Sequence, residues 1–185
     1  MTTYSRQERT ARPLDAARLD ELALAYVARF AVSAAKLETY LKRKLGERGW
    51  AGETPPPVAE IVARFVGAGY VDDAAYARMK AGSLRRRGLG ERRIGAALSA
   101  AGIDGDLREQ VRGREGEQRA AALAFARRKR LGPFGPAVDR AGREKQLAAM
   151  LRAGHRMDHA RALVQAGDSG AAEEWAALAD EEDDE

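Results

Sequence analysis

The amino-acid sequence predicts an all-α protein of three tandem three-helix repeats that form an elongated, curved body. Apolar residues recur at helical spacing, without the alternation of strands, along most of the chain. The composition is rich in alanine, leucine, arginine and glutamate, which favours helix. Similar sequences also recur at predicted helix ends. A chain of 185 residues is long enough to bury a core, either as one domain or as several small modules.

Three amphipathic helices are predicted in the first repeat. Their apolar stripes are Leu19, Leu22, Tyr26, Val27 and Phe30; Leu37, Leu41 and Leu45; and Val58, Ile61, Val62, Phe65 and Val66. Ser33 is the predicted N-cap of the second helix, because a serine oxygen accepts hydrogen bonds from the free amides at a helix start. The prolines at positions 55–57 separate the second helix from the third.

Two features then recur and divide the chain into repeats. Aromatic residues that directly follow an alanine recur at intervals of 50 and 49 residues: Tyr26, Tyr76 and Phe125. Glycines that follow an apolar residue four positions earlier recur at predicted helix ends: Gly49, Gly102 and Gly154. We infer a flexible segment, three stacked repeats and an acidic tail, at residues 1–14, 15–70, 71–113, 114–167 and 168–185. The alternative is a single compact helical bundle in which alanine-rich similarity imitates repeats.

Positive charge is concentrated in the body of the chain. The tail contains nine acids and no base, so without it the net charge rises from +4 to +13. Such a body attracts polyanions or acidic protein surfaces, and we expect the tail to be solvated. The chain has no cysteine, no signal-peptide pattern and no apolar run long enough to span a membrane. We expect a monomeric cytoplasmic protein with no membrane partner.

No combination of residues predicts catalysis, a metal site or a cofactor. His155 and His159 lie four residues apart, but no third ligand accompanies them and His155 follows a helix-ending glycine. We interpret both histidines as structural. Asp72 and Asp73 are interpreted as the N-cap and first-turn acid of a helix, not as a catalytic pair. The sequence therefore predicts a binding protein that is not an enzyme.

Basic residues form one cluster in each predicted repeat. The middle cluster surrounds the turn Gly88-Leu89-Gly90. The candidate binding residues are Lys42 and Arg43 in the first repeat, Arg85, Arg86, Arg87, Arg92 and Arg93 in the second, and Arg127, Arg128 and Arg130 in the third. Aligned along one face, they would form a track for phosphates or carboxylates. Charge alone leaves both nucleic acid and protein open as partners.

Four motifs follow one another in a recognisable order. They are SAAKLETYLKRKL from Ser33, GYVDDAAYA from Gly69, RRGLGERRI from Arg86, and Gly102-Ile103-Asp104. Over residues 19–167 this order resembles the RecX family of recombination regulators, and the acidic tail falls outside the pattern. The middle section, GYVDDAAYA followed by the arginine-rich Gly-x-Gly, is the most specific part of the resemblance.

The resemblance implies a small, non-enzymatic regulator that lodges in the helical groove of the RecA filament on DNA. It implies inhibition of the ATPase, strand-exchange and coprotease activities of RecA, and hence of recombination and the SOS response. It also implies single- or double-stranded DNA as a second partner. It assigns a structural role to Tyr70, Asp72 and Tyr76, and contact with filament or DNA to the arginines of the middle cluster. The alternative is a general DNA-binding helical protein whose effects on recombinase are incidental.

Overall fold

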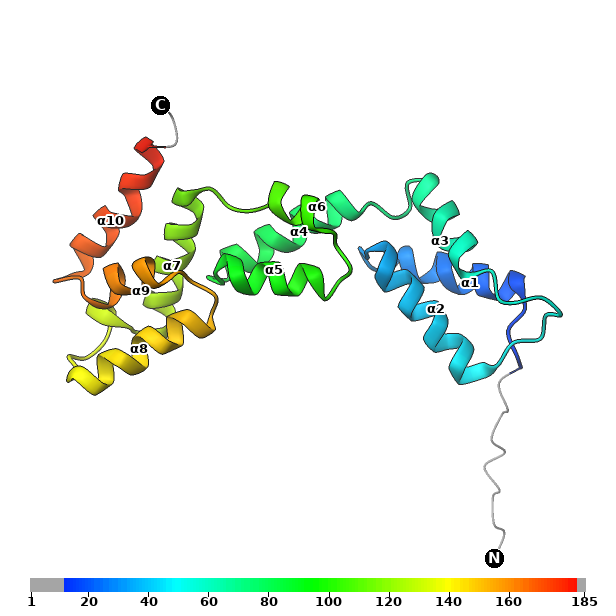
Figure 1. The fold of residues 1–185 in the computed structure, drawn as a ribbon, viewed down its shortest axis with the longest axis horizontal. Helices are drawn as coiled ribbons and strands as arrows, with labels where there is room; N and C mark the ends of the chain where they lie inside the picture. The colour runs from blue at the N-terminus through cyan, green and yellow to red at the C-terminus, as the bar shows by residue number, and fades with distance from the viewer. Residues whose placement is uncertain (1–11, 183–185) are drawn as a thin grey trace, which may run out of the picture. The chain divides into compact units, whose positions relative to one another are not determined.

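The computed structural model describes the protein from residue 12 to residue 182 (Figure 1). Within these residues lie ten α-helices, one short 3₁₀ helix and a single isolated β-bridge, which confirms the predicted all-α class. The chain divides after Asp73 into two compact units, here called unit 1 and unit 2. No helix in the described range is long and apolar enough to cross a lipid bilayer, since the longest have 15 residues.

Three helices lie in the described residues of unit 1, before α4 (Asp73–Arg86) begins at its last residue. They are α1 (Ala16–Val27), α2 (Ala34–Arg48) and α3 (Val58–Gly67). The predicted apolar stripes meet in one core, whose most buried members include Leu19, Leu37, Leu41, Ile61 and Phe65. The predicted cap of α2 is confirmed, because Ser33 Oγ accepts a hydrogen bond from the amide of Lys36 over 3.3 Å.

The start of unit 1 differs from the sequence prediction. Residues 12–14 were predicted to belong to a flexible segment, yet Leu14 is fully buried. Its amide donates to the carbonyl oxygen of Gly49 over 3.0 Å, and its own carbonyl accepts from the amide of Ala51 over 2.9 Å. Arg48 also donates to the carbonyl oxygen of Arg12. These bonds fix the chain at the end of α2; the rest of the predicted segment, residues 1–11, lies outside the described residues.

Unit 2 contains the remaining helices in the described range, except that Asp73, the first residue of α4, belongs to unit 1. They are α4 (Asp73–Arg86), α5 (Glu91–Ser99), α6 (Gly105–Gln110), α7 (Glu115–Lys129), η1 (Gly132–Phe134), α8 (Arg140–Arg152), α9 (Met157–Val164) and α10 (Ser169–Glu182). Ile94 and Leu98 belong to the core that α4, α5 and α6 share. Met150 and Leu163 belong to the second core, which α7, α8 and α9 share with α10.

The predicted glycine helix ends are confirmed, because each one requires a left-handed backbone that only glycine adopts readily. Gly49, Gly102 and Gly154 have φ angles of 78°, 75° and 98°. Beyond Gly102, the amide of Ile103 donates to the carbonyl of Leu98 over 3.1 Å. The same pattern closes α8, where the amide of His155 donates to the carbonyl of Met150 over 3.2 Å.

The aromatic recurrence does not mark one structural position. Tyr26 and Phe125 lie near the C-terminal ends of α1 and α7, whereas Tyr76 lies in the first turn of α4. Tyr76 and Phe125 are buried, and Tyr26 is only partly buried. The similar spacing therefore comes from alanine-rich helices in which the aromatic residue occupies different positions, not from one repeated structural site.

The prediction of a solvated acidic tail is also wrong, because residues 169–182 form a helix that packs on the rest of unit 2. Ala172 and Ala176 of α10 are buried, and Trp175 packs against the core. The carbonyl of Trp175 accepts from Arg119 Nη1 of α7 over 3.2 Å. These contacts stabilise α10 through an apolar stripe that its high charge conceals in the sequence.

Candidate functional site

The candidate site is the α4–α5 corner, residues 85–93, where the sequence places five arginines around a short turn. Helix α4 ends at Arg86, and Gly88 reverses the chain with a φ angle of 72°. The amide of Leu89 then donates to the carbonyl of Leu84 over 3.1 Å. The next helix, α5, starts at Glu91, two residues after Leu89. The end of α4 and the start of α5 therefore lie close together.

The corner docks on the α8–α9 connection through backbone atoms. The amide of Gly90 donates to the carbonyl of Ala153 over 3.0 Å, and the amide of Arg92 donates to the carbonyl of Gly154 over 3.3 Å. A Cβ atom on Gly90 would overlap the backbone of Gly154, and one on Gly154 would lie 2.5 Å from the amide nitrogen of Arg93. Two glycines thus permit a crossing that any side chain would prevent.

His155 completes this joint from the third repeat. Its ring is only 5% exposed, lies 5.4 Å from the ring of Phe125, and has Nε2 3.2 Å from the carbonyl oxygen of Gly88. Burial lowers the pKa of His155 to about 4, and the hydrogen bond to Gly88 offsets only part of that effect. The neutral ring therefore donates its Nε2 proton to a carbonyl oxygen that can only accept.

His159 has a different partner. Its Nε2 lies 2.8 Å from Glu115 Oε1, and its ring meets the edge of Trp175 at 5.3 Å between centroids. Burial raises the pKa of Glu115, but hydrogen bonds from Arg119 and His159 outweigh it and leave the pKa below its ordinary value. In the described part of the chain, no three His, Asp or Glu side chains gather to hold a metal ion.

Three of the predicted binding arginines build the joint itself. The side chain of Arg85 is only 12% exposed; it pairs with Glu91 at 2.9 Å and donates to the carbonyl of Val111 over 3.0 Å. Arg92 donates to the carbonyl of Leu151, and Arg128 to the carbonyl of Arg87. The prediction that these side chains all face a partner is corrected: helix-terminal carbonyls satisfy Arg92 and Arg128, and Glu91 satisfies Arg85.

Four other predicted arginines are left for a partner. Arg86, Arg87, Arg93 and Arg130 are exposed, and none forms an ion pair with a described residue. Arg130 follows α7 in a left-handed conformation, with a φ angle of 53°. A guanidinium without an internal carboxylate keeps its full capacity for bidentate bonds to carboxylate or phosphate.

The remaining predicted cations are ion-paired. Lys42 pairs with Glu38 over 2.6 Å, Arg43 pairs with Glu47, and Arg127 pairs with Glu173 of α10. These pairs are exposed, so each contributes little to stability and can exchange for a partner. Alignment of the three basic clusters along one face stays a prediction.

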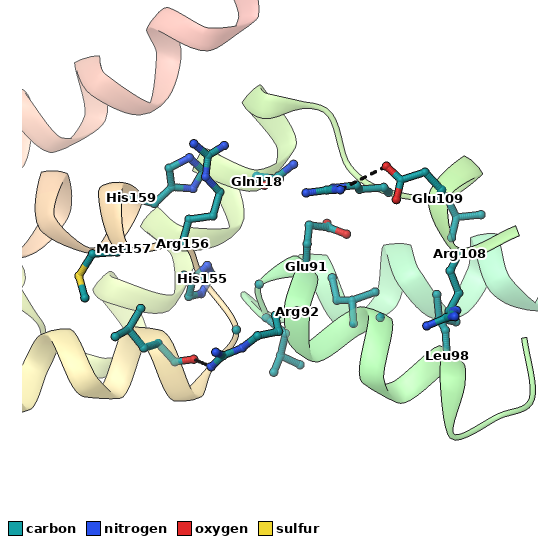
Figure 2. A pocket seen from close by; sticks show the side chains of 18 of the residues that line it. Glu91, Arg92, Leu98, Arg108, Glu109, Gln118, His155, Arg156, Met157 and His159 are labelled. Carbon is teal, nitrogen blue, oxygen red and sulfur yellow. Dashed lines mark hydrogen bonds and ion pairs between the residues drawn. The ribbon is translucent and has the colours of Figure 1, made fainter. Parts of the chain in front are cut away.

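A groove of about 590 Å³ lies beside the corner (Figure 2). One wall comes from α5 and α6 and the other from the α8–α9 connection. Leu89, Leu151 and Met157 contribute apolar surface. Four arginines also line the groove: Arg92, Arg108, Arg112 and Arg156. The groove therefore combines apolar surface with guanidinium groups and with the carboxylates of Glu91 and Glu109.

Comparison with known proteins identifies the family. Residues 72–111, which contain α4 to α6, match the family model "RecX, second three-helix domain". The chain is 33% identical to "Regulatory protein RecX" of Myxococcus xanthus over 156 residues, covering 79% of this chain and 83% of that protein. The chain belongs to the RecX family. It is also 34% identical to "Regulatory protein RecX" of Deinococcus radiodurans over 125 residues, which cover 66% of this chain and 58% of that protein.

Solved RecX structures share the fold. The crystal structure of RecX from Lactobacillus salivarius matches with a TM-score of 0.62 at 18% identity, over 80% of this chain and 94% of that one. A second crystal structure of a regulatory protein RecX matches with a TM-score of 0.63 at 18% identity, over 80% of this chain and 70% of that one. At this identity the matches support the helical fold alone.

The RecX hallmark tyrosines differ in their surroundings. Tyr76 is buried in the core around α4. Tyr70 is 60% exposed and leans on Phe65 at 5.5 Å between ring centroids. Burial fits the predicted structural role of Tyr76, whereas for Tyr70 that role stays a prediction.

The RecX hallmark acids lie at the start of α4, as predicted, but one of them binds the start of another helix. Asp72 directly precedes the helix and Asp73 is its first residue. Asp73 Oδ1 accepts a hydrogen bond from the amide of Ala34, the first residue of α2, over 2.8 Å. This contact lies within unit 1 and satisfies an amide that the start of α2 leaves free.

Sequence reasoning missed three groove arginines: Arg108, Arg112 and Arg156. Arg108 and Arg112 lie four apart, a spacing that places them on the same side of α6 and the residues just after it. That signal was available, although short helices such as α6 are weakly marked in a sequence. Arg156 becomes significant only when the α8–α9 connection meets α5, which no local pattern indicates.

Proposed function

We propose that this RecX-family chain binds the RecA filament in its helical groove and inhibits the ATPase, strand-exchange and coprotease activities of RecA. The observation that carries the proposal is the set of exposed, unpaired arginines on a fixed backbone corner: Arg86, Arg87, Arg93 and Arg130. Membership of the RecX family supports a regulatory role, and the family resemblance names RecA as the partner.

The fixed corner favours tight binding. Backbone bonds from Gly90 and Arg92, together with the buried ring of His155, hold the corner before any partner arrives. A preorganised surface loses less conformational entropy on association than a mobile one does. The arginines that project from it therefore bind carboxylate or phosphate groups at a lower entropic cost.

The neighbouring groove favours a protein partner over nucleic acid alone. Its arginine side chains already bond to carboxylates or carbonyls of this chain, and these exposed pairs can exchange for acidic residues of a partner. Leu151 and Met157 provide apolar surface that a phosphate backbone does not use. An acidic and partly apolar segment of a filament subunit matches both features. A protein held between subunits restricts their movement, so inhibition by this route requires no catalytic step and no cofactor.

Hydrolysis of ATP by RecA on single-stranded DNA tests the proposal. The wild type is compared with the triple variant R86E/R87E/R93E, which leaves the joint-forming Arg85 and Arg92 intact. The matched control R143E/K145E/R161E makes the same change in charge at exposed cations of unit 2 that have no ion pair with a described residue. We expect substoichiometric inhibition by the wild type and the control, and its loss in the corner variant.

Two outcomes would contradict the proposal. Equal inhibition by the corner variant and the wild type would remove the corner from the binding surface. Inhibition that scales with the nucleotide concentration rather than with RecA subunits, with a steep dependence on salt, would instead favour the general DNA-binding protein.

A further inference from the structure

Unit 1 carries a series of aromatic rings with cations at both ends, on α1, α2 and the loop between them. We name it the aromatic–cation ladder, and its members are Arg29, Phe30, Tyr26, Tyr40, Arg43 and Lys44. The rings of Tyr26 and Tyr40 stack with centroids 4.0 Å apart and an interplanar angle of 3°. The ring of Phe30 lies 5.7 Å from that of Tyr26 at an angle of 54°.

The cations are placed over the outer rings. The guanidinium of Arg29 lies 5.9 Å from the ring centroid of Phe30. On the other side, Arg43 lies 5.4 Å and Lys44 5.9 Å from the ring centroid of Tyr40. Such cation–π contacts orient the charged groups along the ladder.

The ladder is open to a ligand at Phe30, which is 54% exposed in the loop between α1 and α2. The loop itself is fixed, because the amides of Arg29 and Phe30 both donate to the carbonyl of Tyr26 over 3.2 Å. A single exposed phenylalanine is ordinary on a protein surface, so exposure alone indicates nothing. Here the exposed ring projects from a hydrogen-bonded turn, contacts the ring of Tyr26 in the stacked tyrosine pair, and has Arg29 over it.

The charge of this segment selects an anionic ligand. Between positions 26 and 48 the sequence has six basic residues and two acidic ones, a net charge of +4. The two acids, Glu38 and Glu47, are both already paired with lysines or arginines of the same helix. The surface therefore attracts a polyanion, and its rings offer apolar faces between the charges.

We propose that the aromatic–cation ladder of unit 1 binds single-stranded DNA. An unpaired base stacks on the exposed ring of Phe30, and the neighbouring phosphates bind Arg29, Arg43 and Lys44. Duplex DNA keeps its bases stacked internally and offers only phosphates to this surface. An acidic peptide matches the charges but has no flat rings at every residue. The choice of DNA over RNA rests on the proposed function, in which the partner filament is assembled on DNA.

The test measures DNA binding without RecA, by fluorescence anisotropy of a labelled oligothymidylate with the full chain. We expect F30A to weaken binding at least about fivefold, since one base–aromatic stack contributes a factor of this order or more. The matched control is Y70A, because Tyr70 is a similarly exposed aromatic of the same unit and no cation among the described residues lies over its ring. Circular dichroism checks that both variants fold.

Salt dependence separates stacking from charge. We expect R29Q to reduce the slope of log affinity against log salt by about 0.7, the value for one phosphate contact on a single strand. F30A should leave that slope unchanged, because it removes a stack and no charge.

Three results would overturn this proposal: equal losses in F30A and Y70A, equal binding of duplex and single strand, or a preference for oligouridylate. Its failure is distinguishable from failure of the proposed function. Loss of DNA binding in F30A with unchanged RecA inhibition supports the ladder and leaves the corner as the inhibitory surface. Normal DNA binding by F30A refutes the ladder, whatever the RecA assay shows.

Discussion

His155 donates its Nε2 proton to the carbonyl oxygen of Gly88 over 3.2 Å, across a sequence separation of 67 residues. This bond joins the helix-ending turn of the third repeat to the helix-ending turn of the second. Because Gly88 begins the turn that carries the exposed arginines, the protonation of one buried ring is coupled to the geometry of the proposed RecA-binding surface.

Acidification should weaken unit 2 through His155. Burial lowers the pKa of His155 from 6.5 to about 4 in the folded protein, whereas the unfolded chain has a value near 6.5. Between these values the unfolded state binds a proton that the folded state does not bind. The free energy of unfolding therefore falls as pH drops from about 6.5 towards 4, by about 2–3 kcal/mol.

Urea unfolding of a W50F background measures this effect, because Trp175 then reports on unit 2 alone. H155Q keeps a donor for Gly88 but does not titrate, so its stability should change less than that of the wild type between pH 6.5 and 4.5. The carboxyls of Glu115 and Asp158, whose pKa values are lowered, lose their contributions only at lower pH. Parallel curves for the wild type and H155Q would contradict the prediction.

Alanine at Gly90 should disrupt the joint, whereas alanine at Gly95 should not. A Cβ on Gly90 overlaps the backbone of Gly154, which cannot move without breaking the hydrogen bonds of the crossing. We expect G90A to lower the free energy of unfolding by at least about 2 kcal/mol. Gly95 lies inside α5, the helix that Gly90 precedes, with nothing within 4 Å of an added Cβ, so G95A should raise stability by about 0.5–1 kcal/mol. Denaturant midpoints of the two variants measure the difference, and equal midpoints would refute the crossing.

Adjacent arginines should have opposite roles. R85A leaves the partly buried Glu91 without its ion pair and the Val111 carbonyl without its donor, so we expect a loss of about 3 kcal/mol. R86A removes an exposed side chain and should change stability by less than about 0.5 kcal/mol. Thermal denaturation of both variants distinguishes the structural arginine from the one available to a partner. If R85A were as stable as the wild type, Arg85 would again be a candidate for binding a partner.

Removal of α10 should destabilise the third repeat. Truncation after Gly167 exposes the surface that Ala172, Trp175 and Ala176 cover, and we expect a loss of about 2–4 kcal/mol by far-ultraviolet circular dichroism. E173Q breaks only the exposed pair with Arg127 and should cost less than about 1 kcal/mol. A truncation with no effect on stability would show that the segment acts as the solvated tail that its charge suggests.

Local signals explain what the sequence could predict. Gly102 and Gly154 end helices through a conformation that depends on their own backbone, so the sequence alone is enough to predict these helix ends. Arg92 and Arg128 bind carbonyls 59 and 41 residues away, and no local pattern specifies such partners. Helix α10 lies between these cases. Its buried residues at 172 and 176, with Trp175 between them, have helical spacing, but the nine acids between positions 168 and 185 favour the prediction of a tail.

Neutralising Glu47 should strengthen binding of single-stranded DNA by the aromatic–cation ladder. Glu47 accepts from Arg43 and, over 2.7 Å, from Lys44; the hydrogen bond from Lys44 and the charge of both neighbours hold its pKa below the ordinary value. It therefore stays ionised at neutral pH and competes with phosphate for both cations. We expect E47Q to increase the affinity for oligothymidylate about two- to fivefold at low salt, with a smaller gain at high salt as screening weakens the competition. The control is E21Q, which removes the exposed partner of Arg18 on the same unit and should leave the affinity nearly unchanged. Equal gains in E47Q and E21Q would mean that only the net charge of unit 1 matters, and the specific contacts of Arg43 and Lys44 with DNA would have to be abandoned.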